Sequence, residues 1–296
     1  MKYIKSIAAS LVLAGSMAMT SCDPSDFGNI NDNPNYPTEG YTYMQFKYAA
    51  IYARNFIMTS SSYDPWPMEW SGYLAEAKNN QYGPLTTTRD FSTAGYYQYA
   101  IKNLTKIIEA NQNEETKSKV SVTAFGSNAN QIAVCTTLRA FYYMTLSDIQ
   151  GPIVYSESLK GDSEDNFTPK FDTQKDVYAG LDQELNSVYT MFDTNSSLSS
   201  DDIFFGGDIA KWKKFNATLR MMMAIKLADV DPSTGSSRFA KAFNDGGMTS
   251  ADDSFCYTFD TSVSYSWMYY NGNMGYASRS NYFAPNKVFV DALKEY

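Results

Sequence analysis

Apolar side chains recur at spacings of three and four residues along most of this chain, and that period constrains the fold more than any other feature. The pattern is clearest over 208–230, where Trp212 and Leu219 share one helical face and Asp231-Pro232 is expected to end the helix. Similar patterns predict helices over 44–58, 97–110, 129–149 and 174–191, and shorter helices over 237–243 and 285–296. We therefore predict a mainly α fold.

Two of these helices allow more detailed expectations. In 44–58 the spacing indicates that Met44, Tyr48 and Ile51 lie on one apolar face. Thr173 stands where the cap of the 174–191 helix is expected, because its hydroxyl can accept a bond from a free backbone N–H of the first turn.

The helices follow one another in antiparallel-looking pairs, 97–110 with 129–149 and 174–191 with 208–230. Paired amphipathic helices of this size resemble tetratricopeptide units. Long irregular segments separate them, at 59–95, 150–172 and 246–285. The one alternating stretch, SFCYTF at 254–259, predicts a single short hairpin arm, so we expect less than about 10% strand, below the usual 20–25%.

The first 43 residues do not have the composition of a packed domain. Residues 1–21 combine two lysines with an apolar run of signal-peptide length, and MTSC ends in Cys22. This junction predicts a lipoprotein signal peptide over 1–21, lipid on Cys22 and a Pro/Asn-rich tether over 22–43 that holds the 44–296 domain near a membrane. An ordinary signal peptide followed by an incidental cysteine, or an uncleaved N-terminus, remains the alternative.

Charge and composition exclude several kinds of chemistry. The net charge is −8 without any basic run, so we expect no nucleic-acid partner. The chain has no histidine, which removes imidazole bases and His zinc sites. We predict no metal site and no cofactor besides the lipid. The adjacent acids Asp201-Asp202, Asp252-Asp253 and Glu114-Glu115 are expected to be solvated, which disfavours a glycoside hydrolase.

Cysteine usage adds little to this picture. Cys135 lies in the 129–149 helix and is best explained as a small buried hydrophobe. An oxidising compartment would allow a disulfide with Cys256, which we consider the less favoured reading.

Three long segments together resemble one family: LRAFYYMTLSDIQGPIVYSESLKG, FTPKFDTQKDVYAGLDQELNSVYTMF and DIFFGGDIAKWKKFNATLRMMMAIKLADVDP. Their order and spacing, across roughly 97–295, are similar to the SusD/RagB outer-membrane lipoproteins. The resemblance implies a helical scaffold of tetratricopeptide-like pairs carrying an irregular binding region. It also implies a surface-exposed, lipid-anchored protein that captures glycans, or in some branches peptides, for a TonB-dependent SusC-like transporter. Family members are substantially longer than this chain.

Sugars stack their C–H faces on aromatic rings while amides bind their hydroxyls, so we look for aromatics interleaved with amides on loops. Two segments, 61–83 and 264–282, have this composition. The ligand-binding candidates are Trp66, Trp70, Tyr73, Asn79, Asn80, Trp267, Tyr269, Tyr270 and Asn271. Some of these rings will instead pack the loops. Trp212 and the FYY triplet at 141–143 have helical spacing and are expected in the core. A peptide ligand remains the alternative, because the acidic chain would suit a cationic peptide.

Overall fold

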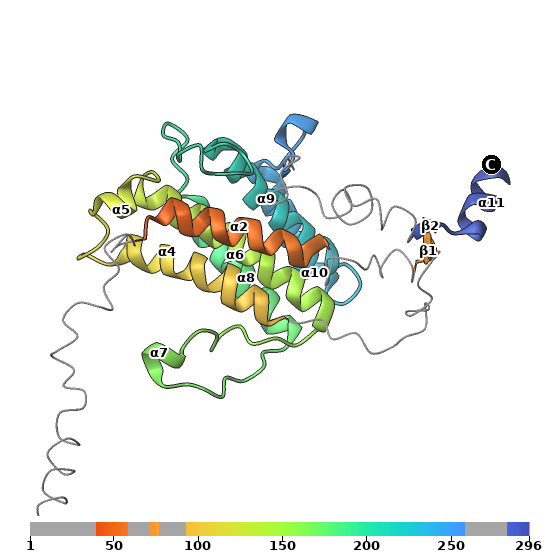
Figure 1. Ribbon diagram of the computed structural model, residues 1–296, viewed down its shortest axis with the longest axis horizontal. Helices are drawn as coiled ribbons and strands as arrows, with labels where there is room; N and C mark the ends of the chain where they lie inside the picture. The colour runs from red at the N-terminus through yellow and green to blue at the C-terminus, as the bar shows by residue number, and fades with distance from the viewer. Residues whose placement is uncertain (1–39, 59–70, 77–92, 258–282, 296) are drawn as a thin grey trace, which may run out of the picture. The chain divides into compact units, whose positions relative to one another are not determined.

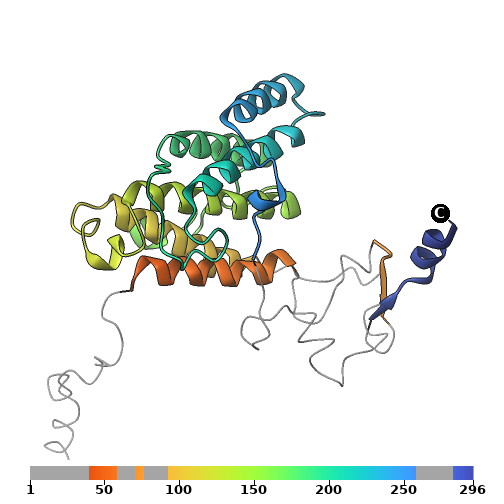
Figure 2. The same ribbon diagram turned by 90° about the horizontal axis from the view of Figure 1, so that it is seen from above.

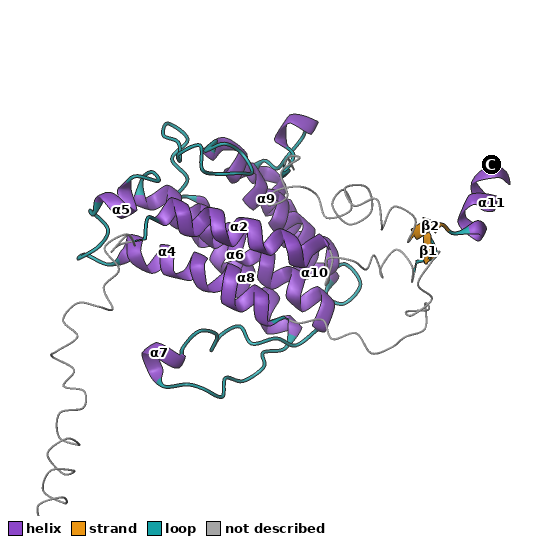
Figure 3. Cartoon of the chain, viewed as in Figure 1, coloured by secondary structure: helices purple, strands orange, loops and turns teal. Residues whose placement is uncertain are grey.

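The computed structural model describes residues 40–58, 71–76, 93–257 and 283–295. Helices dominate the described part, and the strands are two segments of three residues each (Figures 1 and 3). The mainly α fold and the low strand content are confirmed for this part of the chain.

The elements in order are α2 (Thr42–Met58), β1 (Leu74–Glu76), the π-helical turn η2 (Tyr96–Ile101), α4 (Lys102–Gln112), α5 (Val120–Thr123), α6 (Asn128–Gln150), α7 (Gly161–Glu164), α8 (Gln174–Tyr189), α9 (Ile209–Lys226), α10 (Pro232–Asp245), the 3₁₀ turn η3 (Ala251–Asp253), β2 (Phe283–Pro285) and α11 (Lys287–Glu295).

The longer helices pack against their neighbours in chain order (Figure 2). Helix α2 lies on η2 and α4, α4 on α6, α6 on α8, α8 on α9, and α9 on α10. The two predicted pairs, α4 with α6 and α8 with α9, are therefore in contact. Because α6 also packs on α8, and α9 also packs on α10, the helices form a continuous stack, and tetratricopeptide-like pairing stays a prediction.

Side-chain caps fix where several helices begin. The Thr173 hydroxyl accepts from the backbone N–H of Asp176 at 3.2 Å, so the predicted cap of α8 is confirmed. Asp231 caps α10 by accepting from the N–H of Thr234, also at 3.2 Å. Asp231-Pro232 was expected only to end the preceding helix, and the next helix was expected to begin at 237. That start was wrong, because an aspartate before a proline in the first turn also initiates a helix.

The helical core confirms most of the predicted buried positions. Trp212 is fully buried, as is Cys135, and both Tyr142 and Tyr143 of the FYY triplet are buried. Cys135 and Cys256 are both free, so the disulfide is not formed. Helix α8 contributes Val177, Leu181, Leu185 and Val188 to the core as well.

The apolar face predicted for α2 was wrong. Met44 and Tyr48 are exposed, whereas Phe46, Ala49 and Ala50 are buried. The small side chains of Ala49 and Ala50 let α2 pack on η2 and α4. Packing on these neighbours, and not the size of Met44 and Tyr48, decides which face of α2 is buried. Tyr48 instead meets the ring of Tyr99 on the outer side, in an edge contact with centroids 6.2 Å apart.

A buried arginine joins the last three helices of the stack. Arg220 of α9 donates to Asp245 at the end of α10 and to Asn186 of α8, both at 2.6 Å. A buried guanidinium is tolerated only when it is paired in this way. Arg220 therefore fixes the end of α10 against α8 and α9.

The two strands lie where the sequence analysis expected irregular structure. β1 and β2 pair antiparallel, with Ala75 opposite Ala284. The predicted hairpin arm at 254–259 is wrong for its described part, because 254–257 is not strand. Its alternation has another cause, since Phe255 points into an aromatic cluster described below. None of the helices in the described part is long and apolar enough to cross a bilayer.

Candidate functional site

Tyr73 is the one predicted ligand-binding residue that the structure describes. Its side chain is 52% exposed, and its ring meets Phe289 of α11 edge-on with centroids 4.7 Å apart. The N–H of Asn286 donates to the Tyr73 carbonyl at 3.0 Å. Tyr73 is thus held by β2–α11 while much of its side chain stays open. The other candidates lie outside the described residues: Cys22, Trp66, Trp70, Asn79, Asn80, Trp267, Tyr269, Tyr270 and Asn271.

An aromatic cluster surrounds Trp212 of α9, made of Phe204, Phe205, Trp212, Phe215 and Phe255. Phe255 stacks on Phe215 with centroids 4.2 Å apart and on Phe204 at 4.3 Å. The candidate segment 264–282 follows Phe255 by nine positions in the sequence and lies outside the described residues.

Asp202 lies under this cluster and organises the turn before α9. It is 1% exposed and accepts from Trp212 Nε1 at 2.7 Å and from the N–H groups of Gly207 (3.0 Å) and Phe204 (3.1 Å). Burial raises its pKa, while these donors act in the opposite direction. Our expectation of a solvated Asp202 was wrong. The turn leaves several N–H groups and an indole N–H without acceptors, and a carboxylate satisfies them together.

Asp253 is also buried, contrary to expectation, but its pKa shifts the other way. The Lys214 ammonium (2.7 Å) and then the N–H of Thr249 (3.0 Å) donate to it and lower its pKa to about 2. Asp252, Glu114 and Glu115 are exposed, as predicted. Each buried aspartate therefore accepts hydrogen bonds from structural donors, while Asp201 is partly exposed beside Lys47 and Asp252 is exposed. This arrangement does not favour an acid–base pair.

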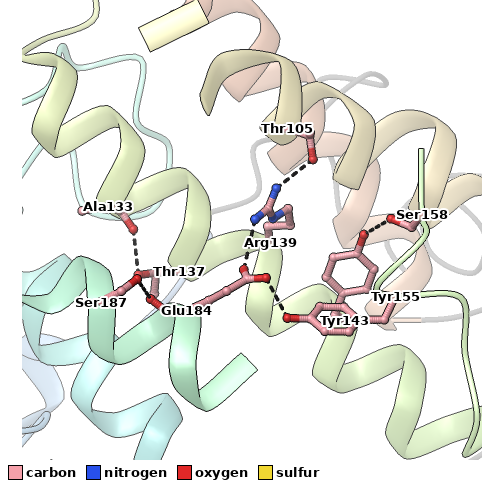
Figure 4. A network of polar contacts seen from close by, with 9 residues as sticks. All are labelled: Thr105, Ala133, Thr137, Arg139, Tyr143, Tyr155, Ser158, Glu184 and Ser187. Atoms are coloured by element: carbon pink, nitrogen blue, oxygen red, sulfur yellow. Dashed lines mark hydrogen bonds and ion pairs between the residues drawn. The ribbon is translucent and has the colours of Figure 1, made fainter. Parts of the chain in front are cut away.

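A polar network ties the 151–160 segment to the helices (Figure 4). Arg139 of α6 donates to Glu184 of α8 and to Thr105 of α4, both at 3.0 Å. The Tyr155 hydroxyl donates to the other Glu184 oxygen at 2.7 Å. Burial and then the Glu184 charge raise the pKa of Tyr155, so its hydroxyl remains a donor. The Glu184 carboxylate thereby joins α6, α8 and the segment, and Arg139 extends the network to α4.

Further contacts fix the same segment residue by residue. The hydroxyls of Tyr143 and Ser158 are hydrogen-bonded, and Tyr97 donates to the carbonyl of Val154 at 2.7 Å. The Tyr155 ring lies directly on Gly180 of α8, where an added Cβ would stand 2.5 Å from a ring carbon. The segment from 153 to 158 is therefore rigidly positioned on the helices, which is the condition for building a site on a loop.

A hollow of about 140 Å³ lies next to this network. One wall belongs to α4 and the other to the residues that follow Ser158. It is lined by Lys102, Thr105, Lys106, Glu109, Leu159 and Gly161. Thr105 belongs both to the hollow and to the network, because its hydroxyl accepts from Arg139.

In the described part of the chain no group of three or more His, Cys, Asp or Glu side chains could hold a metal ion. The same part presents the half-exposed Tyr73, the fixed 153–158 segment and the hollow lined by two lysines.

The fold matches solved structures closely enough to compare them. A Bacteroidetes AC2a SusD-like protein matches with TM-score 0.66 and 24% identity, over 86% of this chain and 48% of that one. A chitin-binding protein matches with TM-score 0.64 and 22% identity, over 86% and 52%. A SusD homolog from Bacteroides uniformis ATCC 8492 matches with TM-score 0.62 and 20% identity, over 81% and 50%. The chain thus spans about half the length of these structures.

The family comparison extends across nearly the whole described region. No curated protein matches the chain. A family model described as SusD-like, starch-binding and associating with the outer membrane matches residues 43–296. The helical fold and this match agree with the resemblance carried by the three sequence segments. The chain therefore belongs to the SusD-like family of outer-membrane-associated binding proteins.

Proposed function

We propose that this chain is part of a cell-surface lipoprotein that captures glycans at the outer membrane and delivers them to a TonB-dependent SusC-like transporter, without catalysing a reaction. The observation that carries the proposal is the starch-binding family match over 43–296. The structural match to a chitin-binding protein supports a saccharide as the ligand class.

The described surface supports binding through aromatic rings. Tyr73 presents a half-exposed side chain, and its ring is held edge-on by Phe289. Rings that are held before ligand arrives lose little entropy on binding. This favours stacking of sugars, whose C–H faces need a flat and stationary partner.

Glycan capture is tested by a glycan and peptide array on the untethered domain, followed by titration of the best ligand. Trp267→Ala and Trp70→Ala should each weaken binding about thirtyfold, as hot-spot truncations of about 2 kcal/mol do. Their melting temperatures should stay near that of the unchanged chain. Trp212→Ala is the matched control, because its ring is buried and should affect stability instead. Unchanged affinity in both loop variants would contradict these site residues.

Salt dependence separates the two ligand classes. A neutral glycan has no charge to screen, so its affinity should change little between low and high salt. A cationic peptide attracted by a chain of net charge −8 should lose affinity steeply. Release of new reducing ends from oligosaccharides would contradict the absence of catalysis.

Lipid anchoring at Cys22 has its own test. Cys22→Ala should leave the leader uncleaved or the protein mislocalised, because the thiol is the attachment point for lipid. Fractionation of cells and metabolic labelling with palmitate measure both outcomes. Normal delivery of this variant to the outer membrane would contradict the lipoprotein assignment. Delivery to a transporter is tested by co-purification with a TonB-dependent barrel encoded beside this chain.

A further inference from the structure

The hollow beside α4 has a basic wall built on one helix face. Lys102, Thr105, Lys106 and Glu109 are spaced three, four and seven residues from the first, so they project from the same side of α4. Lys106 pairs with Glu109 at 2.9 Å, and both side chains are about half exposed. The Lys102 ammonium has no ion pair or hydrogen bond to any residue that the structure describes. The wall therefore carries one uncompensated positive charge in a chain whose net charge is −8.

The opposite wall has an unusual backbone. Leu159 has φ = 61°, in the left-handed region that side-chain-bearing residues rarely adopt. Asp165, at the end of α7, is the only other non-glycine residue with a positive φ in the described part of the chain. Strained residues of this kind persist where the surroundings hold them, and they concentrate at functional sites. Here the Tyr143–Ser158 hydrogen bond holds the residue immediately before Leu159.

An exposed aromatic ring contacts one of the residues that line the hollow. Phe167 is 77% exposed, yet its ring lies against Gly161, where an added Cβ would stand 3.3 Å from a ring carbon. Gly161 lines the hollow, so the ring is in contact with one residue of its wall. The predicted ligand-binding residues all lie outside the irregular segment 150–172. The structure shows that it presents an open ring next to polar side chains.

We propose that the hollow between α4 and residues 159–161 binds one negatively charged sugar unit, carboxylated or sulfated, of a longer glycan. The acidic group lies against Lys102 and Lys106, the Thr105 hydroxyl meets a sugar hydroxyl, and the sugar face stacks on Phe167. This rests on the proposed function in that the ligand is a glycan. It adds a charged subsite remote in sequence from the predicted aromatic loops.

The size of the hollow fits one unit. Pockets for drug-sized ligands are typically about 300–1,000 Å³, and this hollow has about 140 Å³. Fixed walls compensate for the small contact area, because neither wall has to be ordered on binding. The network through Arg139, Glu184 and Tyr155 connects the two walls through Thr105 and the segment before Leu159.

The test compares three trisaccharide- or tetrasaccharide-sized probes by isothermal titration on the full untethered chain. Trigalacturonic acid carries carboxylates, its methyl ester has the same shape without charge, and κ-carrageenan tetrasaccharide carries sulfate without carboxylate. We expect at least one charged probe to bind about tenfold more tightly than the neutral ester, the effect of a hydrogen bond to a charged group. The preferred probe identifies carboxylate or sulfate as the recognised group.

Two variants and two controls localise the effect. Lys102→Gln should remove the preference for charge, and Phe167→Ser should weaken the preferred charged probe about tenfold. Lys241→Gln and Phe243→Ser alter an exposed lysine and an exposed phenylalanine of α10 and should leave binding unchanged. All four positions are exposed, so the variants are expected to fold. Circular dichroism verifies this.

Three results would overturn the subsite: equal affinity for the acid and its ester, no binding of any charged probe, or unaltered binding in Lys102→Gln and Phe167→Ser. An equal loss in Lys241→Gln would assign the preference to overall charge and also overturn it. Retained binding of neutral glycans in these cases leaves the proposed function intact. A chain that binds charged probes at this hollow but no neutral glycan would support the subsite and contradict the neutral-glycan site.

Discussion

Phe215 and Phe167 are the same side chain in opposite surroundings. Phe215 is buried in the aromatic cluster on α9, with the ring of Phe255 stacked on it at 4.2 Å. Phe167 stands on a loop with most of its surface open, and its contact with Gly161 covers only part of the ring. One ring contributes to folding through burial, and the other leaves its apolar surface available to a ligand.

The difference shows where binding chemistry can lie on a helical scaffold. Rings at helical spacing face the helical stack and are buried in it, as Trp212 and Tyr142 are. They are therefore not accessible to a ligand. Rings on segments between helices differ: Phe204 and Phe255 pack into the cluster around Trp212, whereas Phe167 stays open. Glu184, Arg139 and the Tyr143–Ser158 hydrogen bond fix the 153–158 segment that precedes Phe167 (Figure 4).

The largest effect is expected at the centre of the aromatic cluster. Trp212→Ala should lower the free energy of unfolding by about 3–5 kcal/mol, because it leaves a large cavity and removes the indole donor to Asp202. Urea denaturation followed by circular dichroism measures the loss. Trp212→Phe keeps most of the apolar volume and should lose clearly less. Equal losses in the two variants would mean that the hydrogen bond, not packing, dominates.

Sequence reasoning succeeded where a local pattern determined the structure. Thr173 was identified as a cap because its oxygen needs only the N–H of Asp176, three residues away. Trp212 was placed in the core because helical spacing alone puts it there. The face of α2 was wrong for a related reason: the choice between Met44 and Ala49 depends on how closely α4 approaches, which α2 itself does not encode.

The site was harder to predict, because its parts meet through distant contacts. Arg139 and Tyr155 both donate to the Glu184 carboxylate, and the three residues come from three separate segments. No regular sequence spacing predicts that they meet. A signal did exist for Asp202, since an aspartate before Ile-Phe-Phe-Gly-Gly indicates a turn with free N–H groups. The loop candidates around Trp66 and Trp267 remain predictions.

The next largest effect should separate two adjacent aspartates. Asp202→Asn should cost about 1–3 kcal/mol, because buried N–H donors lose a carboxylate acceptor. Asp201→Asn, with a partly exposed side chain and a 3.6 Å contact to Lys47, should change stability within about 0.5 kcal/mol. Both variants are compared by urea denaturation. A similar loss at both positions would show that Asp202 has no special role beneath the cluster.

The pH dependence should distinguish the two buried aspartates by sign. Asp253 has a pKa lowered to about 2, so its stabilising contribution is present above its usual pKa of 3.8 and disappears as the pH falls toward 2. Asp202 has a raised pKa in the folded chain. Its contribution to stability therefore becomes more favourable as the pH falls through this raised pKa toward the usual value of 3.8. Stability measured against pH for Asp253→Asn and Asp202→Asn, each subtracted from the unchanged chain, should show opposite slopes. Parallel slopes would contradict the assigned causes.

The smallest effect is expected at the exposed ring, and it completes the comparison with Phe215. Phe167→Ser should change the free energy of unfolding by less than about 0.5 kcal/mol, since a ring that is 77% exposed gains little from folding. Phe215→Ser should be destabilising by several times as much, because it places an unpaired hydroxyl and a cavity in the cluster. Thermal and urea unfolding of the two variants give the ratio. A large loss in Phe167→Ser would mean that its ring is a structural support for the 159–171 loop, and its affinity changes could then no longer be assigned to stacking on a ligand.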